Sequence, residues 1–340
     1  MRLIVSGPRF IVTMNNKVLV TGASGHIGGN LIRALIEKGI RPRVLIHQGD
    51  RALEGLDIER AVGDVADIES LRKMFEGVGT VYHLAAVISL QASTDARLEE
   101  VNVIGTRNVV QCCLDFKVKR LLHFSSIHAF KSEPRAVPID ESRDAADPKA
   151  PPYDLSKAAG EREVLAGIAK GLDAVLVNPT GVIGPFDFGP SAMGDVFLQL
   201  YRREMPALVE GDFDWVDVRD VVQGAIAACE KGVAGERYIL SGQRRSIPEL
   251  AKLVEEITGK KAPRFVSPMW LARIGAPFAM LYAKAIGNRP LFTSRSLHAV
   301  RNHSAVTHEK AARELGHHPR PIEDTVKDTF AWFKDAGMLQ

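Results

Sequence analysis

The stretch Lys17–Leu31 reads KVLVTGASGHIGGNL, and the fold of the surrounding chain is organised around it. A short apolar run, Val18–Val20, enters a turn with glycines at 22, 25 and 28, and an amphipathic stretch follows and ends at Gly39. A strand, a glycine-rich turn and a helix form an anion site, because glycine lets the backbone approach a phosphate and the helix N-terminus offers free N–H groups. The spacing G-x-x-G-x-x-G therefore predicts a dinucleotide pyrophosphate site, with a tight turn that binds no ligand as the alternative.

The composition is that of an ordinary globular chain of 340 residues, with 46% hydrophobic and 25% charged residues. These fractions exclude disordered and fibrous classes, and a formal net charge of +3 is too small to indicate a nucleic-acid partner. The three cysteines, two of them adjacent, predict reduced thiols and a cytoplasmic protein. No spacing of histidine, cysteine or carboxylate residues predicts a metal site.

Residues 1–15 are predicted to form an N-terminal extension, because Gly7, Pro8 and Arg9 interrupt the apolar run that a signal peptide requires. From residue 16 to residue 178, apolar strands alternate with helical patterns, which predicts an α/β domain with a doubly wound parallel sheet. Ligands of such a sheet bind beyond the carboxyl ends of its strands. The expected strands are 17–21, 43–46, 59–63, 80–84, 120–124 and 173–178, and the expected helices are 27–38, 68–75, 95–116 and 153–170.

The residues after the second expected strand bear on the choice between NADP and NAD. An acid about 20 residues beyond the glycines would bind the ribose 2′-hydroxyl and repel a 2′-phosphate. Here His47 and Arg51 are placed to face a phosphate, while Asp50 stands three positions late. NADP is therefore favoured, and NAD with Asp50 on its ribose is the alternative. After the third strand, Asp64 is expected either to accept from the adenine amino group or to cap the next helix.

The predicted chemistry lies at Ser126, Tyr153 and Lys157. Ser125 and Ser126 follow the fifth strand, and Tyr153 and Lys157 share a helix face because they are four residues apart. A phenol is a poor acid–base group at neutral pH, so a neighbouring ammonium is expected to lower the pKa of Tyr153. Ser126 would bond a substrate carbonyl while Tyr153 transfers a proton and the cofactor supplies the hydride. A chance Y-x-x-x-K pair on a solvated helix is the alternative.

Together these motifs resemble the short-chain dehydrogenase/reductase superfamily, in its extended, epimerase/dehydratase-like branch. Within that branch the chain is similar to dihydroflavonol reductase-like, 3β-hydroxysteroid dehydrogenase-like and hopanoid-associated bacterial proteins. The matching features are TGxxGxxG at 21–28, GDV at 63–65, HLAA at 83–86, NVxGT at 102–106, FSS at 124–126, YxxxK at 153–157, NPT at 178–180 and VDVRDVV at 216–222.

The resemblance implies a Rossmann-type domain and completes the expected site. Ser126, Tyr153 and Lys157 would be catalytic, and the substrate would contact Ser126, His128, Tyr153 and Val182. A homodimer paired through the helices expected at 95–116 and 153–170 is likewise implied. With the residues already named, the cofactor would be held by Gly22, Ser24, Gly25, His26, Ile27, Gly28, His47, Arg51, Asp64, Val65, Ala85, Ala86, Val87, Ser125, Tyr153, Lys157 and Pro179.

Residues 179–340 are predicted to form a smaller lobe, mainly substrate-binding, with excursions back to the sheet. Its run 266–286 is apolar but too often interrupted by proline and basic residues for a membrane span of about 20 residues. We expect Trp270, Phe278 and Tyr282 from this run to cover an apolar pocket, with interfacial membrane contact as the alternative.

Two further features of this lobe are expected to be structural. Asp220 is predicted to begin a helix, with Arg219 pairing across the seam between the lobes. His317 is expected to lie in a surface loop, because Pro319 follows it closely.

Three functions remain open. The first is NAD(P)-dependent reduction of a bulky apolar ketone or aldehyde; the second is epimerisation or dehydration of a sugar nucleotide with bound NAD. The third is a non-catalytic, dinucleotide-binding regulatory role, against which the joint presence of Ser126, Tyr153 and Lys157 counts. The first is favoured, because residues 178–184 are apolar and no group of basic residues indicates a diphosphate site.

Overall fold

The computed structural model describes residues 17–47, 49–88, 95–272, 274 and 304–339. Its elements follow the alternation of strands and helices expected for the first half of the chain. In chain order they are β1 Lys17–Thr21, α1 His26–Glu37, β2 Arg43–Ile46, η1 Arg51–Leu53, β3 Glu59–Val62, α2 Ile68–Arg72, β4 Val78–His83, α3 Asp95–Arg97, η3 Leu98–Gly105, α4 Thr106–Asp115, β5 Arg120–Phe124, η4 Ile127–Ala129, α5 Pro152–Ile168, β6 Ala174–Pro179, β7 Gly181–Ile183, α6 Ala192–Arg202, β8 Leu208–Val209, β9 Asp212–Asp217, α7 Val218–Lys231, β10 Arg237–Leu240, β11 Gln243–Ser246, α8 Ile247–Thr258, β12 Val266–Ser267, α11 Glu309–Leu315 and α12 Ile322–Asp335.

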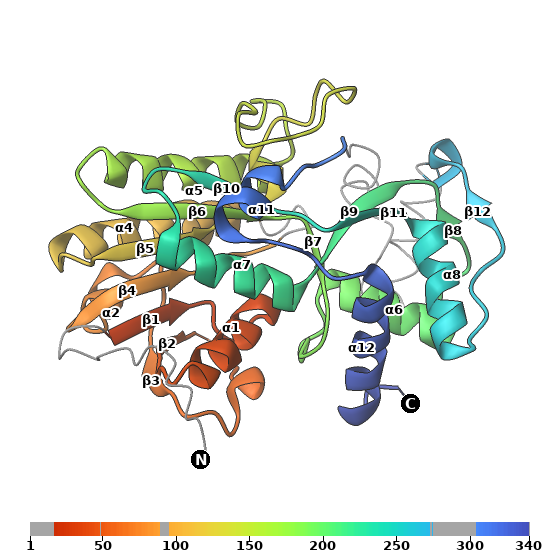
Figure 1. Ribbon diagram of the computed structural model, residues 1–340, viewed down its shortest axis with the longest axis horizontal. Coiled ribbons are helices and arrows are strands. Elements are labelled where there is room, and N and C mark those ends of the chain that lie inside the picture. The colour runs from red at the N-terminus through yellow and green to blue at the C-terminus, as the bar shows by residue number, and fades with distance from the viewer. Residues whose placement is uncertain (1–16, 48, 89–94, 273, 275–303, 340) are drawn as a thin grey trace, which may run out of the picture.

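A seven-stranded sheet forms the centre of the larger lobe, in the order β10-β6-β5-β4-β1-β2-β3. All of its neighbouring strands are parallel, and helices lie over both faces (Figure 1). The predicted doubly wound α/β fold is confirmed, and β1, β2 and β5 have the bounds expected from the sequence. The parallel pairing brings the carboxyl ends of the strands to one edge, where a ligand binds in folds of this kind.

Alternate residues of each strand feed two separate cores. Val18 and Val20 pack with α1, α7 and α11 on one face, whereas Leu19 packs with α2, α4 and α5 on the other. Because successive side chains of a strand point to opposite faces, a strand covered on both sides must be apolar throughout. This explains why the strands read as continuous apolar runs.

The helix expected at 95–116 is divided in the structure. Its middle part, η3, is a π-helix, and it joins the short α3 to α4. Such wider turns often accompany functional sites. Here the π-helix carries Asn102, which contacts the end of β4 as described below.

The smaller lobe packs α6, α8 and α12 around its own apolar core, which includes Phe197, Trp215 and Phe330. It lies beyond the carboxyl edge of the sheet, at the right of Figure 1. Strand β9 pairs with β7 and β11, and β8 pairs with β12. Between these elements the chain returns to the larger lobe, since α7 and α11 cover the sheet and β10 pairs with β6.

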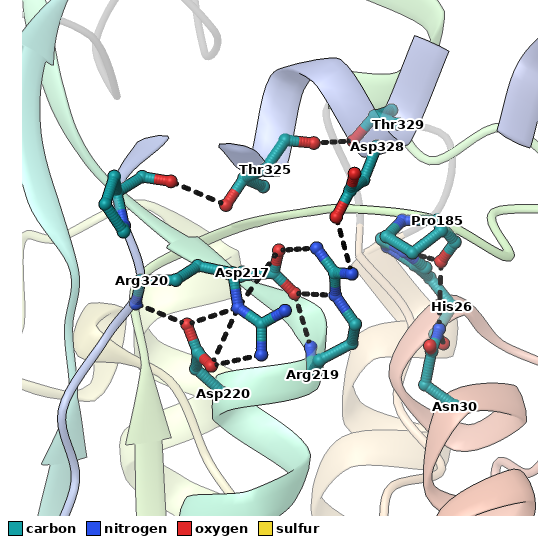
Figure 2. A network of polar contacts seen from close by, with 11 residues as sticks. His26, Asn30, Pro185, Asp217, Arg219, Asp220, Arg320, Thr325, Asp328 and Thr329 are labelled. Carbon is teal, nitrogen blue, oxygen red and sulfur yellow. Dashed lines mark hydrogen bonds and ion pairs between the residues drawn. The ribbon is translucent and has the colours of Figure 1, made fainter. Parts of the chain in front are cut away.

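Charged residues join the lobes at the start of α7 (Figure 2). Asp217, not Asp220, is the N-cap, and its carboxylate accepts from Arg219 N at 2.7 Å. Arg219 pairs with Asp217 and reaches Asp328 of α12 at 2.7 Å, so the expected pairing across the seam is present. Asp220 instead accepts from Arg320, whose backbone N lies 2.8 Å and whose Nη2 lies 2.7 Å from its carboxylate oxygens.

One expectation for the smaller lobe is wrong. His317 is buried, with its Nε2 2.9 Å from Ser241 O, because the chain after α11 folds back over β10. Of the residues expected to cover an apolar pocket, Trp270 is 64% exposed, and Phe278 and Tyr282 lie outside the described residues. None of the described helices is long and apolar enough to cross a bilayer.

Candidate active site

The glycine turn between β1 and α1 is too close to neighbouring backbone for side chains at two of its positions. Gly22 has a φ of 71°, and a Cβ there would lie 2.6 Å from Ala85 N. A Cβ on Gly28 would overlap Gly22 O, whereas one on Gly25 would meet its nearest neighbour at 3.4 Å. No side chain caps α1, so its first N–H groups are left for a ligand. This cradle fits a dinucleotide pyrophosphate.

The residues of the turn differ in exposure and in their contacts. Ser24 and Gly25 are exposed, and Ile27 is half-buried. His26 was expected beside the cofactor, but its Nε2 lies 3.0 Å from Pro185 O, at the edge of the smaller lobe. Only the backbone of His26 is therefore free to meet a phosphate.

The strand ends that would receive the adenosine carry paired charges. His47 Nδ1 lies 3.4 Å from Asp64 Oδ2, and Asp64 Oδ1 accepts from Ala66 N at 2.9 Å. Asp64 thus caps the turn after β3, while Asp67 caps α2. Asp50 Oδ2 lies 3.6 Å from Arg60 Nε.

Other expected cofactor residues surround these pairs. Arg51 is exposed at the start of η1, and Val65 is buried behind β3. Because Asp50 is paired and Arg51 is exposed, the end of β2 presents a basic side chain to solvent.

The ends of the central strands are lined by small side chains and backbone. Asn102 Oδ1 accepts from Val87 N at 2.8 Å, and its Nδ2 donates to Val87 O at 3.0 Å, which fixes the segment that contains Ala85 and Ala86. Ser125 is buried at the end of β5, and its Oγ has no hydrogen-bond partner among the described residues. A buried hydroxyl without a partner is costly, so a ligand at this point would satisfy it. Pro179 ends the neighbouring strand, β6.

The three candidate catalytic residues come together at the end of β5. Ser126 caps η4 by accepting from His128 N at 3.2 Å, and its hydroxyl acts to lower the pKa of Tyr153. Tyr153 lies in the first turn of α5 because Pro151 and Pro152 begin that helix. Lys157, one turn later, is buried and donates from Nζ to Phe124 O at 3.0 Å.

The protonation of Tyr153 differs from the expectation. Burial raises the pKa of its phenol to about 12, a rise that the Ser126 hydroxyl opposes and Asp154 increases. Burial also lowers the pKa of Lys157 to about 8, although Glu161 raises it. The expected lowering of the Tyr153 pKa is therefore wrong, because Lys157 bonds Phe124 rather than the phenol. At neutral pH the site holds a protonated phenol beside a cationic amine.

An aromatic wall stands beside Tyr153. The His128 ring meets Tyr153 edge-on, with centroids 5.5 Å apart, and Phe213 of β9 lies 6.4 Å from His128. His128 Nδ1 pairs with Asp154 Oδ1 at 3.1 Å, which orients the ring. Val182 lies half-buried in β7, which pairs with β9. No sequence pattern indicated Phe213, because only strand pairing in the smaller lobe brings it here.

A buried polar network supports Ser126 from behind. Asn178 Nδ2 donates to Ser126 O at 3.0 Å and to Glu161 Oε1 at 2.7 Å. Glu161 Oε2 pairs with Arg237 Nε at 3.1 Å, and Glu161 is only 2% exposed. In the sequence, Asn178 stands out only as part of the NPT motif, and no pattern indicates Glu161. The described residues hold no group of three or more histidine, cysteine or carboxylate side chains suited to a metal ion.

Comparison with known proteins agrees with this geometry. Residues 18–241 match the model of the NAD dependent epimerase/dehydratase family. Sterol demethylase protein B of Methylococcus capsulatus is 36% identical, over 94% of this chain and 99% of its own. A protein of Synechocystis sp., provisionally named a dihydroflavonol 4-reductase, is 31% identical, over 97% of this chain and 98% of its own.

Among solved structures, that of gox2253 has a TM-score of 0.83 and 34% sequence identity. The alignment covers 96% of this chain and 100% of that one. The fold and the relatives therefore agree. The chain belongs to the NAD-dependent epimerase/dehydratase family of extended short-chain dehydrogenases/reductases and is an NAD(P)-dependent oxidoreductase.

Proposed function

We propose that this enzyme reduces a bulky, largely apolar ketone or aldehyde to an alcohol, with NADP(H) as the preferred cofactor. The observation that carries the proposal is the position of Ser126 and Tyr153 beside the rings of His128 and Phe213. Pockets for small molecules are mostly apolar, and a few polar groups orient the ligand. Here the two hydroxyls are the orienting groups, and the aromatic rings with Val182 are the wall.

The chain's own residues then handle the proton. Ser126 donates a hydrogen bond to the substrate carbonyl oxygen, and Tyr153 gives that oxygen its proton. Solvent restores the proton to the phenolate that this leaves, and Lys157, cationic below a pH of about 8, would donate to the nicotinamide ribose of the bound cofactor. The bound dinucleotide supplies the hydride. Asn178 holds Ser126 in place from behind, and the charge of Glu161 raises the pKa of Lys157.

The cofactor would be held by the glycine turn, the ends of β3 and β4, and Ser125. The preference for NADP rests on the end of β2, where Asp50 pairs with Arg60 and His47 stands in place of an acid. Three buried, unbridged cysteines support a reducing compartment, which we take to be the cytoplasm.

The preference is tested by titrating NADPH and NADH separately and following their fluorescence. We expect NADPH to bind at least as tightly as NADH, and His47→Asp to shift the preference to NADH. A preference of the wild type for NADH beyond about tenfold would contradict the proposal and indicate Asp50 as the ribose ligand.

A sugar nucleotide is the main alternative substrate, and it would require cations for its diphosphate. Several arginines beyond residue 179 are already paired. Arg237 pairs with Glu161, Arg244 with Asp212 at 2.7 Å, and Arg219 with both Asp217 and Asp328. These pairs argue for an uncharged, apolar substrate. The names of the two relatives, a sterol demethylase protein and a dihydroflavonol reductase, support the same class of substrate.

The decisive experiment measures turnover of two substrate panels. One contains polycyclic and long-chain ketones with NADPH, and the other contains UDP- and GDP-sugars with NAD. We expect oxidation of NADPH with the ketones and no reaction of the sugars. Turnover of the sugars without net cofactor change would establish the epimerase, and cofactor binding without any turnover would favour a regulatory protein.

A further inference from the structure

The turn between β7 and α6 adopts a backbone conformation that its residues do not favour by themselves. Gly184 has a φ of 143°, and Phe186, which is not glycine, has a φ of 62°. Such conformations persist where surrounding contacts impose them. We call residues Gly184–Phe188 the seam turn, because they join the larger lobe to the smaller one.

The first contact on the seam turn comes from the cofactor helix. Pro185 O accepts from His26 Nε2 at 3.0 Å and from Asn30 Nδ2 at 3.1 Å, as Figure 2 shows. Because a carbonyl can only accept, His26 carries a proton on Nε2. Asn30 also donates to His26 O at 2.9 Å and is only 6% exposed. Both donors lie in the first two turns of α1, directly after the glycine turn.

Two aromatic rings of the seam turn contact both α1 and α12. The Arg33 guanidinium lies 4.6 Å from the Phe186 ring centroid and 5.3 Å from that of Phe188. Trp332 of α12 packs against both rings, at 6.0 and 5.1 Å. The seam turn is thus enclosed between α1 and α12.

The seam turn also connects a wall of the expected substrate pocket to the first helix of the smaller lobe. Val182 lies two residues before it, in β7. Within it, Asp187 accepts from Ser191 N at 2.9 Å and Ser191 Oγ at 2.7 Å, and Ser191 caps α6. A movement of Pro185 would therefore displace a pocket wall and the first helix of the smaller lobe.

We propose that His26 and Asn30 are positioning residues that couple dinucleotide binding to the geometry of the substrate lobe. The backbone of this helix start would receive the pyrophosphate, while the two side chains hold Pro185. When the cofactor orders the start of α1, these hydrogen bonds also order the seam turn. By thermodynamic reciprocity, an ordered seam turn raises the affinity for the cofactor. This inference rests on the dinucleotide site of the proposed function, but not on the identity of the substrate.

Hydrogen exchange of the full-length protein, with and without NADP⁺ or NAD⁺, tests the coupling. In the wild type we expect the cofactor to slow amide exchange both in the glycine turn and in peptides covering residues 181–191. In Asn30→Leu the glycine turn should stay protected and cofactor affinity should change by no more than about threefold, whereas protection of 181–191 should be lost. His26→Leu should also lose it, and His26→Gln, which keeps a donor near the Nε2 position, should restore most of it.

Asp328→Asn provides the matched control, since it removes one of the two carboxylates paired with Arg219 at the same seam without touching α1. Protection of residues 181–191 should survive in this variant. Cofactor binding to the wild type without protection of 181–191, or protection that persists in Asn30→Leu and His26→Leu, would overturn the coupling alone. Failure of the wild type to bind either dinucleotide would overturn the proposed function together with the coupling.

Discussion

At the scale of single residues, the Tyr153 hydroxyl is the group on which the proposed proton transfer depends. Tyr153→Phe keeps the ring against His128 but removes the proton donor, so kcat should fall by roughly 100-fold or more while cofactor affinity stays nearly unchanged. Lys157→Ala should reduce both, because Lys157 is also expected on the nicotinamide ribose. Steady-state kinetics and cofactor titration measure the two effects. Retention of more than a few per cent of kcat in Tyr153→Phe would remove Tyr153 from its role.

The buried amine of Lys157 gives the reaction a pH dependence. Its pKa is lowered to about 8, so it loses its charge above that pH, whereas Tyr153, with a pKa of about 12, stays protonated. The kcat/KM for ketone reduction should therefore fall above a pH of about 8. Glu161→Gln removes the charge that raises the pKa of Lys157, so the fall in kcat/KM should begin at a lower pH.

The control for this pH profile is Glu163→Gln, on the same helix. Glu163 is paired with Arg107 on the outer surface, so its loss should leave the profile in place. If the fall in kcat/KM shifted by the same amount in both variants, Glu161 would have no particular effect on Lys157.

At the scale of elements, the strand–turn–helix unit formed by β1, the glycine turn and α1 depends on backbone packing. Gly28→Ala should destabilise the protein by roughly 1–3 kcal/mol, because the added methyl overlaps the Gly22 carbonyl. Gly25→Ala is the comparison, since the nearest atom to its Cβ is 3.4 Å away. Thermal melts without cofactor should show a clear loss of Tm for Gly28→Ala only. Equal melting of the two variants would mean that the turn can relax.

At the scale of the whole molecule, the predicted homodimer would pair the surfaces of the helical segments 95–116 and 153–168. Ile104 and Leu165 on these segments are 37% and 36% exposed. A double change, Ile104→Asp with Leu165→Asp, should convert the dimer to a monomer by placing charges in an apolar contact. Val233→Asp, at a 58% exposed site after α7, should not. Light scattering measures both, and a monomeric wild type at micromolar concentration would contradict the prediction.

The sequence by itself determined the fold class, because local patterns specify it. Continuous apolar strands, helical periodicity and the spacing of glycines were sufficient for β1, β2 and β5 to be predicted with their observed bounds. The candidate catalytic set could also be predicted, since Ser126 ends a strand and Tyr153 and Lys157 share one helix face. In each case the residues that matter are near in sequence, or are brought to one edge by parallel pairing.

The tertiary structure decided what depends on contacts between distant segments. The burial of Lys157 and Tyr153 sets their pKa values, and no local pattern reports burial. The pairing of His26 with Pro185 joins residues that are 159 positions apart. Phe213 reaches His128 only through the sheet of the smaller lobe. Such contacts depend on how whole elements pack, because packing fixes the surroundings of each side chain after the local structure has formed.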